Sequence, residues 1–297
     1  MSADDKSGLS RKERIFARLQ ELGAEPKRSL GQNFLISDRV VDRILFAVKH
    51  DPFPELIEVG PGLGALTEDL IQLGKPMKLI ELDRLFAEYW RGRAAESAPP
   101  LPAIELIEGD ALQISWTELG IQPGALFVAN LPYQISSSIV IERSLEPAGI
   151  ARMVLMFQKE VAQRLMARAS TKEYGLLTVI GQTFWDISTV CDAGPNDFFP
   201  PPNVSSRVLL FRRRSPQELA TPEAAQGFLR FAKAAFAHRR KLLIRNLQGG
   251  YFNGDKDLGT QLEAIFAKAG LLHTARAEEL DPAAFVRLYQ AVSSMGS

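Results

Sequence analysis

Short apolar segments alternate with helical stretches through the middle of this chain, and this alternation limits the possible folds more than any other feature. Five segments read as strands, at 56–59, 77–81, 104–107, 125–129 and 153–157. The stretches between them, such as 65–73, carry apolar residues at helical spacing. Buried strands that alternate with helices indicate a parallel sheet covered on both faces. Two further segments, at 187–191 and 207–211, could close one edge of this sheet.

Helical patterns precede this α/β region. The spacing predicts an amphipathic helix over 9–23, in which Ser10 is the N-cap and Glu13 completes a capping box. The segment 27–35 favours neither helix nor strand, and a second helix is expected over 37–50.

A change of composition after Phe211 indicates a second domain. The basic stretch 212–216 reads as a linker, and nearly everything beyond it has helical periodicity. Phe228, Phe231 and Phe236 lie on the apolar stripe of a core-facing helix. We therefore predict an α/β domain over 1–211 and a smaller all-helical domain over 212–297.

Several classes of protein are disfavoured by composition. No apolar run reaches the roughly 18 residues of a membrane span, and the N-terminal residues 1–6 are polar. We therefore expect a cytoplasmic protein without a membrane partner. The single cysteine, Cys191, allows no internal disulfide, and the three histidines are far apart, so no metal site is predicted.

A glycine-rich loop after the first strand indicates a nucleotide-like cofactor. The sequence Gly60-Pro61-Gly62-Leu63-Gly64 follows the strand and opens a helical segment. Such a loop allows close backbone approach to a ligand, and a helix N-terminus supplies free N–H groups. Glu81 ends the next strand, where a carboxylate can accept both hydroxyls of a ribose. This pattern fits both NAD and S-adenosylmethionine.

The third and fourth strands also end in polar residues. Asp110 follows the third strand and could accept from an adenine amino group, although an aspartate there is also a common helix N-cap. The fourth strand runs into Asn130-Leu131-Pro132-Tyr133. Ligands of open α/β sheets bind outside the carboxyl ends of the strands, so this tetrapeptide should face the reaction centre.

The tetrapeptide suits methylation of an adenine amine. The exocyclic nitrogen is a poor nucleophile because its lone pair is delocalised into the ring. The Asn130 side-chain oxygen and the carbonyl of Leu131 or Pro132 can accept its two N–H groups and favour a pyramidal nitrogen. Pro132 stiffens the loop, and Tyr133 offers a face for stacking an extruded base. Phe198, which opens a proline-rich loop, is predicted to lie across the base from Tyr133.

These residues together resemble a known family, the small-subunit ribosomal RNA adenine dimethyltransferases of the KsgA type. The resemblance extends from about Lys27 to Phe285. The segments that carry it are 30–35, 58–64, 80–83, 109–111, 130–133, 158–161, 174–177, 198–204 and 236–241.

The resemblance implies a Rossmann-like class I methyltransferase domain that uses S-adenosylmethionine, followed by a helical domain that recognises rRNA. The implied cofactor contacts are Asn33, Leu35, Gly60, Glu81, Asp110 and Asn130. The implied reaction is the double methylation of N6 on two adjacent adenosines in the 3′-terminal hairpin of 16S rRNA, within the immature small ribosomal subunit. We expect the enzyme to act as a monomer.

Basic clusters supply candidate RNA contacts, although the formal net charge of the chain is zero. Charge clusters are often only solvated surface, but these lie beside an aromatic stripe and beside the segment expected to close over the cofactor, which favours phosphate contacts. The candidates are Lys27, Arg28, Arg239, Arg240, Lys241 and Arg245.

Three other functions stay open at this stage. A large-subunit (23S) rRNA adenine methyltransferase that confers antibiotic resistance would share the catalytic motifs. A non-catalytic ribosome assembly factor would keep the fold, but the intact Asp110, Asn130 and Tyr133 argue against lost catalysis. An NAD-linked dehydrogenase would need a hydride-handling site, and the sequence shows none.

Overall fold

The computed structural model describes residues 8–96, 103–252 and 256–294. The polar residues 1–6, on which part of the predicted localisation rests, lie outside the described residues. The described chain divides into two compact units. Unit 1 comprises the chain up to Ile139 with 147–162 and 188–212, and unit 2 comprises 140–146, 163–187 and the chain from Arg213 onward. The last change of unit therefore falls at 212–213, but two earlier segments also belong to unit 2.

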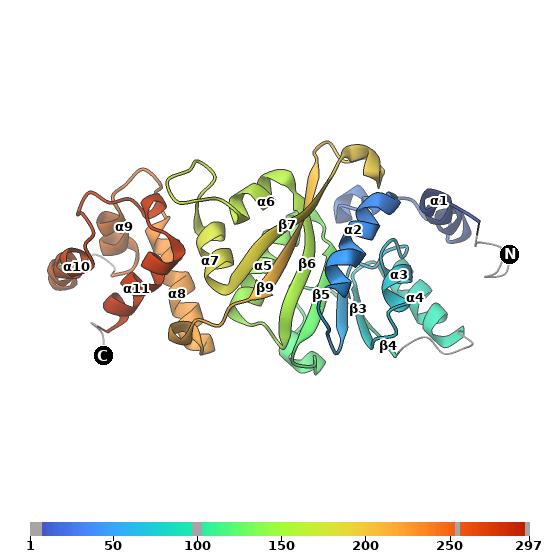
Figure 1. Ribbon diagram of the computed structural model, residues 1–297, viewed down its shortest axis with the longest axis horizontal. Coiled ribbons are helices and arrows are strands. Elements are labelled where there is room, and N and C mark those ends of the chain that lie inside the picture. The colour runs from blue at the N-terminus through green and yellow to red at the C-terminus, as the bar shows by residue number, and fades with distance from the viewer. Residues whose placement is uncertain (1–7, 97–102, 253–255, 295–297) are drawn as a thin grey trace. The chain divides into compact units, whose positions relative to one another are not determined.

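A seven-stranded sheet forms the centre of the α/β region (Figure 1). Its strands are β2 (Leu56–Val59), β3 (Met77–Glu81), β4 (Ile104–Glu108), β5 (Ala125–Asn130), β6 (Ile150–Gln158), β7 (Trp185–Ala193) and β9 (Ser206–Arg213). Their order is β4-β3-β2-β5-β6-β9-β7, with β4 to β6 parallel and β9 antiparallel to β6. The predicted parallel sheet and its two-strand edge are both present, although β9 continues through Arg213, where the sequence suggested a linker.

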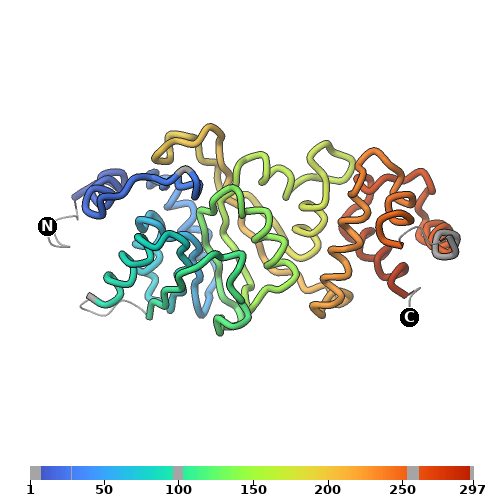
Figure 2. The backbone as a smooth tube through the Cα atoms, turned by 180° about the vertical axis from the view of Figure 1, so that it is seen from behind, coloured from blue at the N-terminus to red at the C-terminus, as the bar shows by residue number. Residues whose placement is uncertain are grey.

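Strand alternation assigns the two faces of the sheet. Leu126 and Val128 of β5 belong to an apolar cluster with α2 (Asp38–Lys49), α3 (Thr67–Ile71) and α4 (Arg84–Glu96). Phe127 points the opposite way and packs on Trp116 of η3 (Trp116–Leu119), with ring centroids 5.3 Å apart. Figure 1 shows α2 in front of the sheet, and Figure 2 shows α5 (Tyr133–Leu145) from the other side.

The N-terminal segment runs from a capped helix to a short strand pair. Helix α1 (Arg11–Glu21) has the predicted Ser10–Glu13 capping box. After η2 (Arg28–Leu30), strand β1 (Phe34–Leu35) pairs antiparallel with β8 (Phe198–Phe199), which follows η4 (Pro195–Asp197). The pairing of β1 with β8 was not predicted, and it joins segments more than 160 residues apart.

Unit 2 is mainly helical. Its helices are α7 (Leu176–Phe184), α8 (Pro222–Ala235), α9 (Leu243–Gly250), α10 (Lys256–Lys268) and α11 (Pro282–Ser293), with η5 (Gln217–Leu219) and η6 (Ala277–Glu279) between them. The predicted stripe on α8 is buried and packs against α11, where the rings of Phe228 and Tyr289 meet edge to face with centroids 5.6 Å apart. Helix α6 (Lys159–Leu165) follows β6. None of the helices in the described chain is long and apolar enough to cross a membrane.

Candidate active site

The loop after β2 is a tight, glycine-dependent turn. Gly60, Gly62 and Gly64 have φ of +69°, +50° and +82°, a region that favours glycine. A Cβ on Gly62 would lie 3.3 Å from the Phe34 ring, whereas a Cβ on Gly60 would meet no atom within 4 Å. The absent side chain of Gly60 therefore leaves open room above the strand end.

One cavity lies at the carboxyl ends of β2 to β5, where the sequence placed the ligand. Predicted site residues that line it are Asn33, Gly60, Glu81, Asp110, Asn130, Leu131, Pro132 and Tyr133. Four strand ends and the N-terminal segment thus bring most of the predicted residues together. No cluster of side chains suited to a metal ion occurs in 8–96, 103–252 or 256–294.

Glu81 presents a buried carboxylate at the end of β3. Its Oε2 accepts from the Gly62 N–H at 3.0 Å, and its Oε1 accepts from the Asp83 N–H at 2.8 Å. Burial raises the pKa of Glu81, and these backbone donors oppose the rise. A carboxylate has about four lone-pair sites, so Glu81 can still accept a hydroxyl group from a ligand.

Glu58 is a buried acid that sequence reasoning did not single out. It lies in β2, lines the cavity and is 2% exposed. Burial raises its pKa to about 8, and the charges of Glu81 and Glu68 add to the rise. Its Oε2 is buried without a hydrogen-bond partner. The sequence did contain a signal for Glu58, since it is a charged residue inside an otherwise apolar strand that leads into a glycine loop.

Asp110 caps the turn that follows β4. Its Oδ1 accepts from the Leu112 N–H at 2.9 Å, and its Oδ2 accepts from the Gln113 side chain at 3.0 Å. Asp110 therefore closes a turn and does not cap a helix, because residues 111–113 form a turn and the next helical segment is η3 at Trp116. Asp110 also lines the cavity, so the same side chain can serve both the turn and a ligand.

Asn130 and Tyr133 are both oriented by hydrogen bonds. The Asn130 Nδ2 donates to the Asn33 carbonyl at 3.0 Å, which leaves Oδ1 as the acceptor end of the carboxamide. The Tyr133 hydroxyl shares a hydrogen bond of 2.8 Å with the Ser206 hydroxyl, and burial raises the pKa of this phenol. The end of β5 thus offers an amide oxygen and a neutral aromatic ring to the same cavity.

The segment 27–35 is tied to the end of β3 through one buried carboxylate. Asp83, with a side chain only 2% exposed, lies 2.9 Å from the Lys27 Nζ and accepts from the Gln32 Nε2 at 2.9 Å. Asp83 also donates its backbone N–H to Glu81. The ion pair therefore connects the segment that borders the cavity to the residue beside the Glu81 carboxylate.

A family model described as ribosomal RNA adenine dimethylase matches residues 23–292. The chain belongs to this family. It is 49% identical to the ribosomal RNA small subunit methyltransferase A of Bdellovibrio bacteriovorus, over 94% of this chain and 97% of that protein. It is 40% identical to the protein of the same name from Syntrophotalea carbinolica, over 90% and 97% of the two chains.

Solved structures show the same fold. A dimethyladenosine transferase from Plasmodium falciparum has a TM-score of 0.70 at 22% identity, covering 89% of this chain and 98% of that one. The 23S rRNA methyltransferase ErmE has a TM-score of 0.61 at 25% identity, covering 88% and 100%. The predicted family, the class I methyltransferase fold and S-adenosylmethionine as cofactor are confirmed.

Two predicted site residues of this dimethylase lie outside the cavity. Strand pairing sets Leu35 opposite Phe198, and the alternation along the strands places both side chains in the apolar core. Leu35 is fully buried and Phe198 is 3% exposed. Neither Leu35 nor Phe198 is among the residues that line the cavity, so the structure does not support the contacts predicted for these two side chains.

Some of the residues predicted to contact RNA are exposed, and some already form ion pairs with other residues of the chain. Arg239, Arg240 and Lys241 are exposed on the turn after α8, and Arg245 is exposed on α9. Arg239 is paired with Glu278 at 2.6 Å and donates to the Thr171 carbonyl. Lys27 is half exposed although it pairs with Asp83. Arg28 begins η2, and its side chain is outside what the structure describes.

Asp83→Asn is expected to loosen the segment 27–33. The introduced asparagine would keep a side-chain oxygen for the Leu85 N–H, which Asp83 now caps at 3.1 Å, but would lose the ion pair with Lys27. We expect faster amide hydrogen exchange in 27–33 and several-fold weaker S-adenosylmethionine binding, about 1 kcal/mol. Glu88→Gln, which removes an exposed pair with Arg84, is the matched control. Unchanged exchange in 27–33 would show that Asp83 does not hold the segment.

Proposed function

We propose that this protein transfers methyl groups from S-adenosylmethionine to N6 of two adjacent adenosines in the 3′-terminal hairpin of 16S rRNA. Each adenosine would become N6,N6-dimethyladenosine during maturation of the small ribosomal subunit. The proposal depends mainly on the orientation of the Asn130 carboxamide at the carboxyl end of β5, where its Nδ2 donates to the Asn33 carbonyl. Asn130 and Glu81 both line the same cavity.

The chain fits the cofactor at three places. Gly60 leaves room at the loop, Glu81 provides a carboxylate for ribose hydroxyls, and Asp110 provides one for an adenine amine. Asn33 and Asn130 complete the proposed contacts. When bound, S-adenosylmethionine supplies the methyl group on its sulfonium.

The protein's own contribution is orientation rather than strong base catalysis. In the proposal, Asn130 Oδ1 and the Leu131 or Pro132 carbonyl accept the two N–H groups of the target amine. This arrangement makes the nitrogen lone pair available in line with the methyl group. Tyr133 stacks on the extruded base, and its neutral phenol suits a ring that acts through its face. The methylated nitrogen becomes acidic and releases its proton to water, so no dedicated base is required.

The comparisons favour the small-subunit substrate over the alternatives. The relatives at 49% and 40% identity are named for the small subunit, whereas the 23S enzyme is 25% identical. Oriented Asn130 and Tyr133 side chains disfavour a purely non-catalytic assembly factor.

Residues 212–297 are proposed to recognise the rRNA. Exposed Arg240, Lys241 and Arg245 support phosphate binding, with Arg239, Lys27 and Arg28 as further candidates. We also propose that the protein acts as a monomer. Because the proposed substrate is a maturing ribosomal subunit, we propose that the protein acts in the cytoplasm.

Methyl transfer to isolated ribosomal subunits tests the proposed substrate. Immature small subunits from a dimethylation-deficient strain and large subunits would be incubated separately with labelled S-adenosylmethionine. We expect label in the 3′-terminal hairpin of 16S rRNA, with up to four methyl groups per subunit because each of two adenosines receives two. Label in large-subunit rRNA, or none in either, would overturn the proposal.

A further inference from the structure

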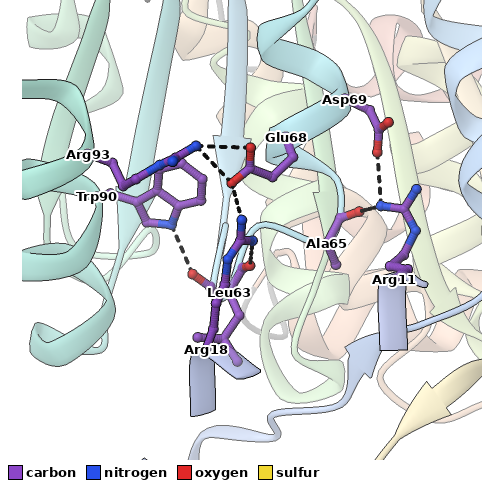
Figure 3. Close-up of polar contacts among 9 residues, drawn as sticks. Arg11, Arg18, Leu63, Ala65, Glu68, Asp69, Trp90 and Arg93 are labelled. Carbon is purple, nitrogen blue, oxygen red and sulfur yellow. Dashed lines mark hydrogen bonds and ion pairs between the residues drawn. The ribbon is translucent and has the colours of Figure 1, made fainter. Parts of the chain in front are cut away.

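The glycine loop is held by side chains from two helices (Figure 3), and none of these side chains lines the cavity. The Trp90 Nε1 of α4 donates to the Gly62 carbonyl at 2.9 Å. From α1, the Arg18 Nη1 donates to the Leu63 carbonyl and the Arg11 Nη1 donates to the Ala65 carbonyl, both at 2.5 Å. Three carbonyls of a four-residue stretch are therefore fixed by side-chain donors.

Helix α1 buries two arginines on its apolar face. Arg11 and Arg18 are seven residues apart, two helical turns, and each is 6% exposed. Between them Ile15 packs with Leu63 in an apolar cluster. A buried arginine is costly unless its donors are satisfied, so these residue types on a core-facing stripe indicate a specific acceptor.

Arg18 bridges the loop and an acid on α3. While Nη1 binds the Leu63 carbonyl, Nη2 pairs with Glu68 at 2.5 Å. The Arg18 guanidinium also lies 5.6 Å from the centre of the Tyr89 ring. A Cβ on Gly64 would come within 2.9 Å of both the Arg18 Nη1 and the Trp90 ring. The planar guanidinium therefore fits closely behind the loop, which a lysine could not reproduce.

Fixing these carbonyls fixes the opposite side of the loop as well. The carbonyl and the N–H of one trans peptide point in opposite directions, so each held carbonyl sets the orientation of the next N–H. Leu63 and its carbonyl face α1, whereas Gly60, Gly62, Ala65 and Leu66 line the cavity. A loop with three left-handed glycines has wide conformational freedom without such restraints.

We propose that Arg18, with Arg11, is a positioning residue for the cofactor: α1 holds the glycine loop in the shape that binds S-adenosylmethionine. The proposal rests on the proposed function only for the identity of this ligand. Preorganisation of a loop raises affinity because less ordering remains to occur on binding. In this proposal the arginines act through the loop backbone, since neither of them lines the cavity.

Calorimetric titration of the full-length chain with S-adenosylmethionine, without RNA, tests this role. Arg18→Met removes the guanidinium and keeps an apolar stem. Arg14→Met is the control on the same helix, because the Arg14 Nη1 donates to the Leu9 carbonyl instead. Arg93→Met is the control for charge, because Arg93 also pairs with Glu68. We expect about tenfold or greater loss of affinity in Arg18→Met and changes within about twofold in both controls.

Steady-state kinetics separate positioning from general damage. For Arg18→Met we expect a raised KM for S-adenosylmethionine, with the KM for RNA and kcat at saturating cofactor largely unchanged. Arg18→Lys, which keeps the charge and can reach one of the two acceptors, should recover part of the affinity. If Arg18→Met does not fold, Arg18→Lys takes its place in the titration. In that case, wild-type affinity for S-adenosylmethionine in Arg18→Lys would contradict the proposal.

Two results would overturn the inference. Wild-type affinity in a folded Arg18→Met would show that α1 only stabilises the fold. An equal loss in Arg93→Met would assign the effect to the charge of Glu68 rather than to the Leu63 carbonyl. If the wild-type chain binds no S-adenosylmethionine, both the proposed function and the role of α1 are contradicted. The titration contains no RNA, so an error in the proposed RNA substrate would not change its result.

Discussion

Asn130→Ala is expected to lose turnover while cofactor binding is largely kept. The variant removes the amide oxygen proposed to accept from the target amine, and the Glu81 and Gly60 contacts remain. Loss of one preorganised hydrogen-bonding group that acts on the reacting atom typically costs about 10²- to 10³-fold in rate. Single-turnover methylation of small subunits at saturating S-adenosylmethionine measures the rate, and calorimetry measures the affinity.

Two further variants define the role of the Asn130 side chain. Asn130→Asp keeps an oxygen but loses the Nδ2 donor that holds the carboxamide on Asn33, so we expect it to be impaired as well. Asn196→Ala, in η4 and away from the cavity lining, is the control and should retain wild-type turnover. Undiminished turnover in Asn130→Ala would remove the role assigned to this side chain.

Glu58→Gln is expected to make the free energy of unfolding less sensitive to pH. The pKa of Glu58 is about 8 in the folded chain and near 4.5 when exposed. Between these values the folded state binds more protons than the unfolded state, so stability falls as pH rises from about 4.5 to 8. At about 1.4 kcal/mol per pH unit, the loss from this one group amounts to at most about 5 kcal/mol.

Urea unfolding at pH 5.5, 7 and 8.5 measures this effect without cofactor. Relative to the wild-type, Glu58→Gln should gain stability progressively from pH 5.5 to 8.5, whatever constant offset the amide introduces. Glu88→Gln, at a half-exposed glutamate on α4, serves as the control and should stay parallel to the wild-type. A constant difference between Glu58→Gln and the wild-type across this range would mean that Glu58 is ionised in the folded chain.

Local patterns predicted much of the fold because each strand and helix carries its own periodicity. The strands β2 and β3 match their predicted bounds, and the Ser10–Glu13 capping box is present at the start of α1. The β1–β8 pair was not predictable, since two-residue strands far apart in sequence carry no periodic signal. The same pairing buries Phe198, which appeared from the sequence to be available to the base.

The residues of the candidate site that lie at strand ends were predictable. The ion pairs and hydrogen bonds that hold the surrounding segments were less so. Glu81 and Asn130 are the last residues of apolar strands, so the topology of a parallel sheet brings them together. The partners of Lys27 and Arg18 come from segments 56 and 45 residues away, and nothing in a basic residue's own sequence context identifies its acceptor. The raised pKa of Glu58 results mainly from burial, and this burial could be recognised only from the folded structure.

Nucleoside analysis of the methylated RNA identifies the atom of adenine that receives the methyl groups. Small subunits from a dimethylation-deficient strain would be treated with the enzyme and S-adenosylmethionine, and their 16S rRNA digested and analysed by mass spectrometry. We expect N6,N6-dimethyladenosine as the end product, at two residues per RNA. Methylation at a ring nitrogen of adenine, or on any other base, would contradict the assignment of Asn130 and its neighbours to the exocyclic amine.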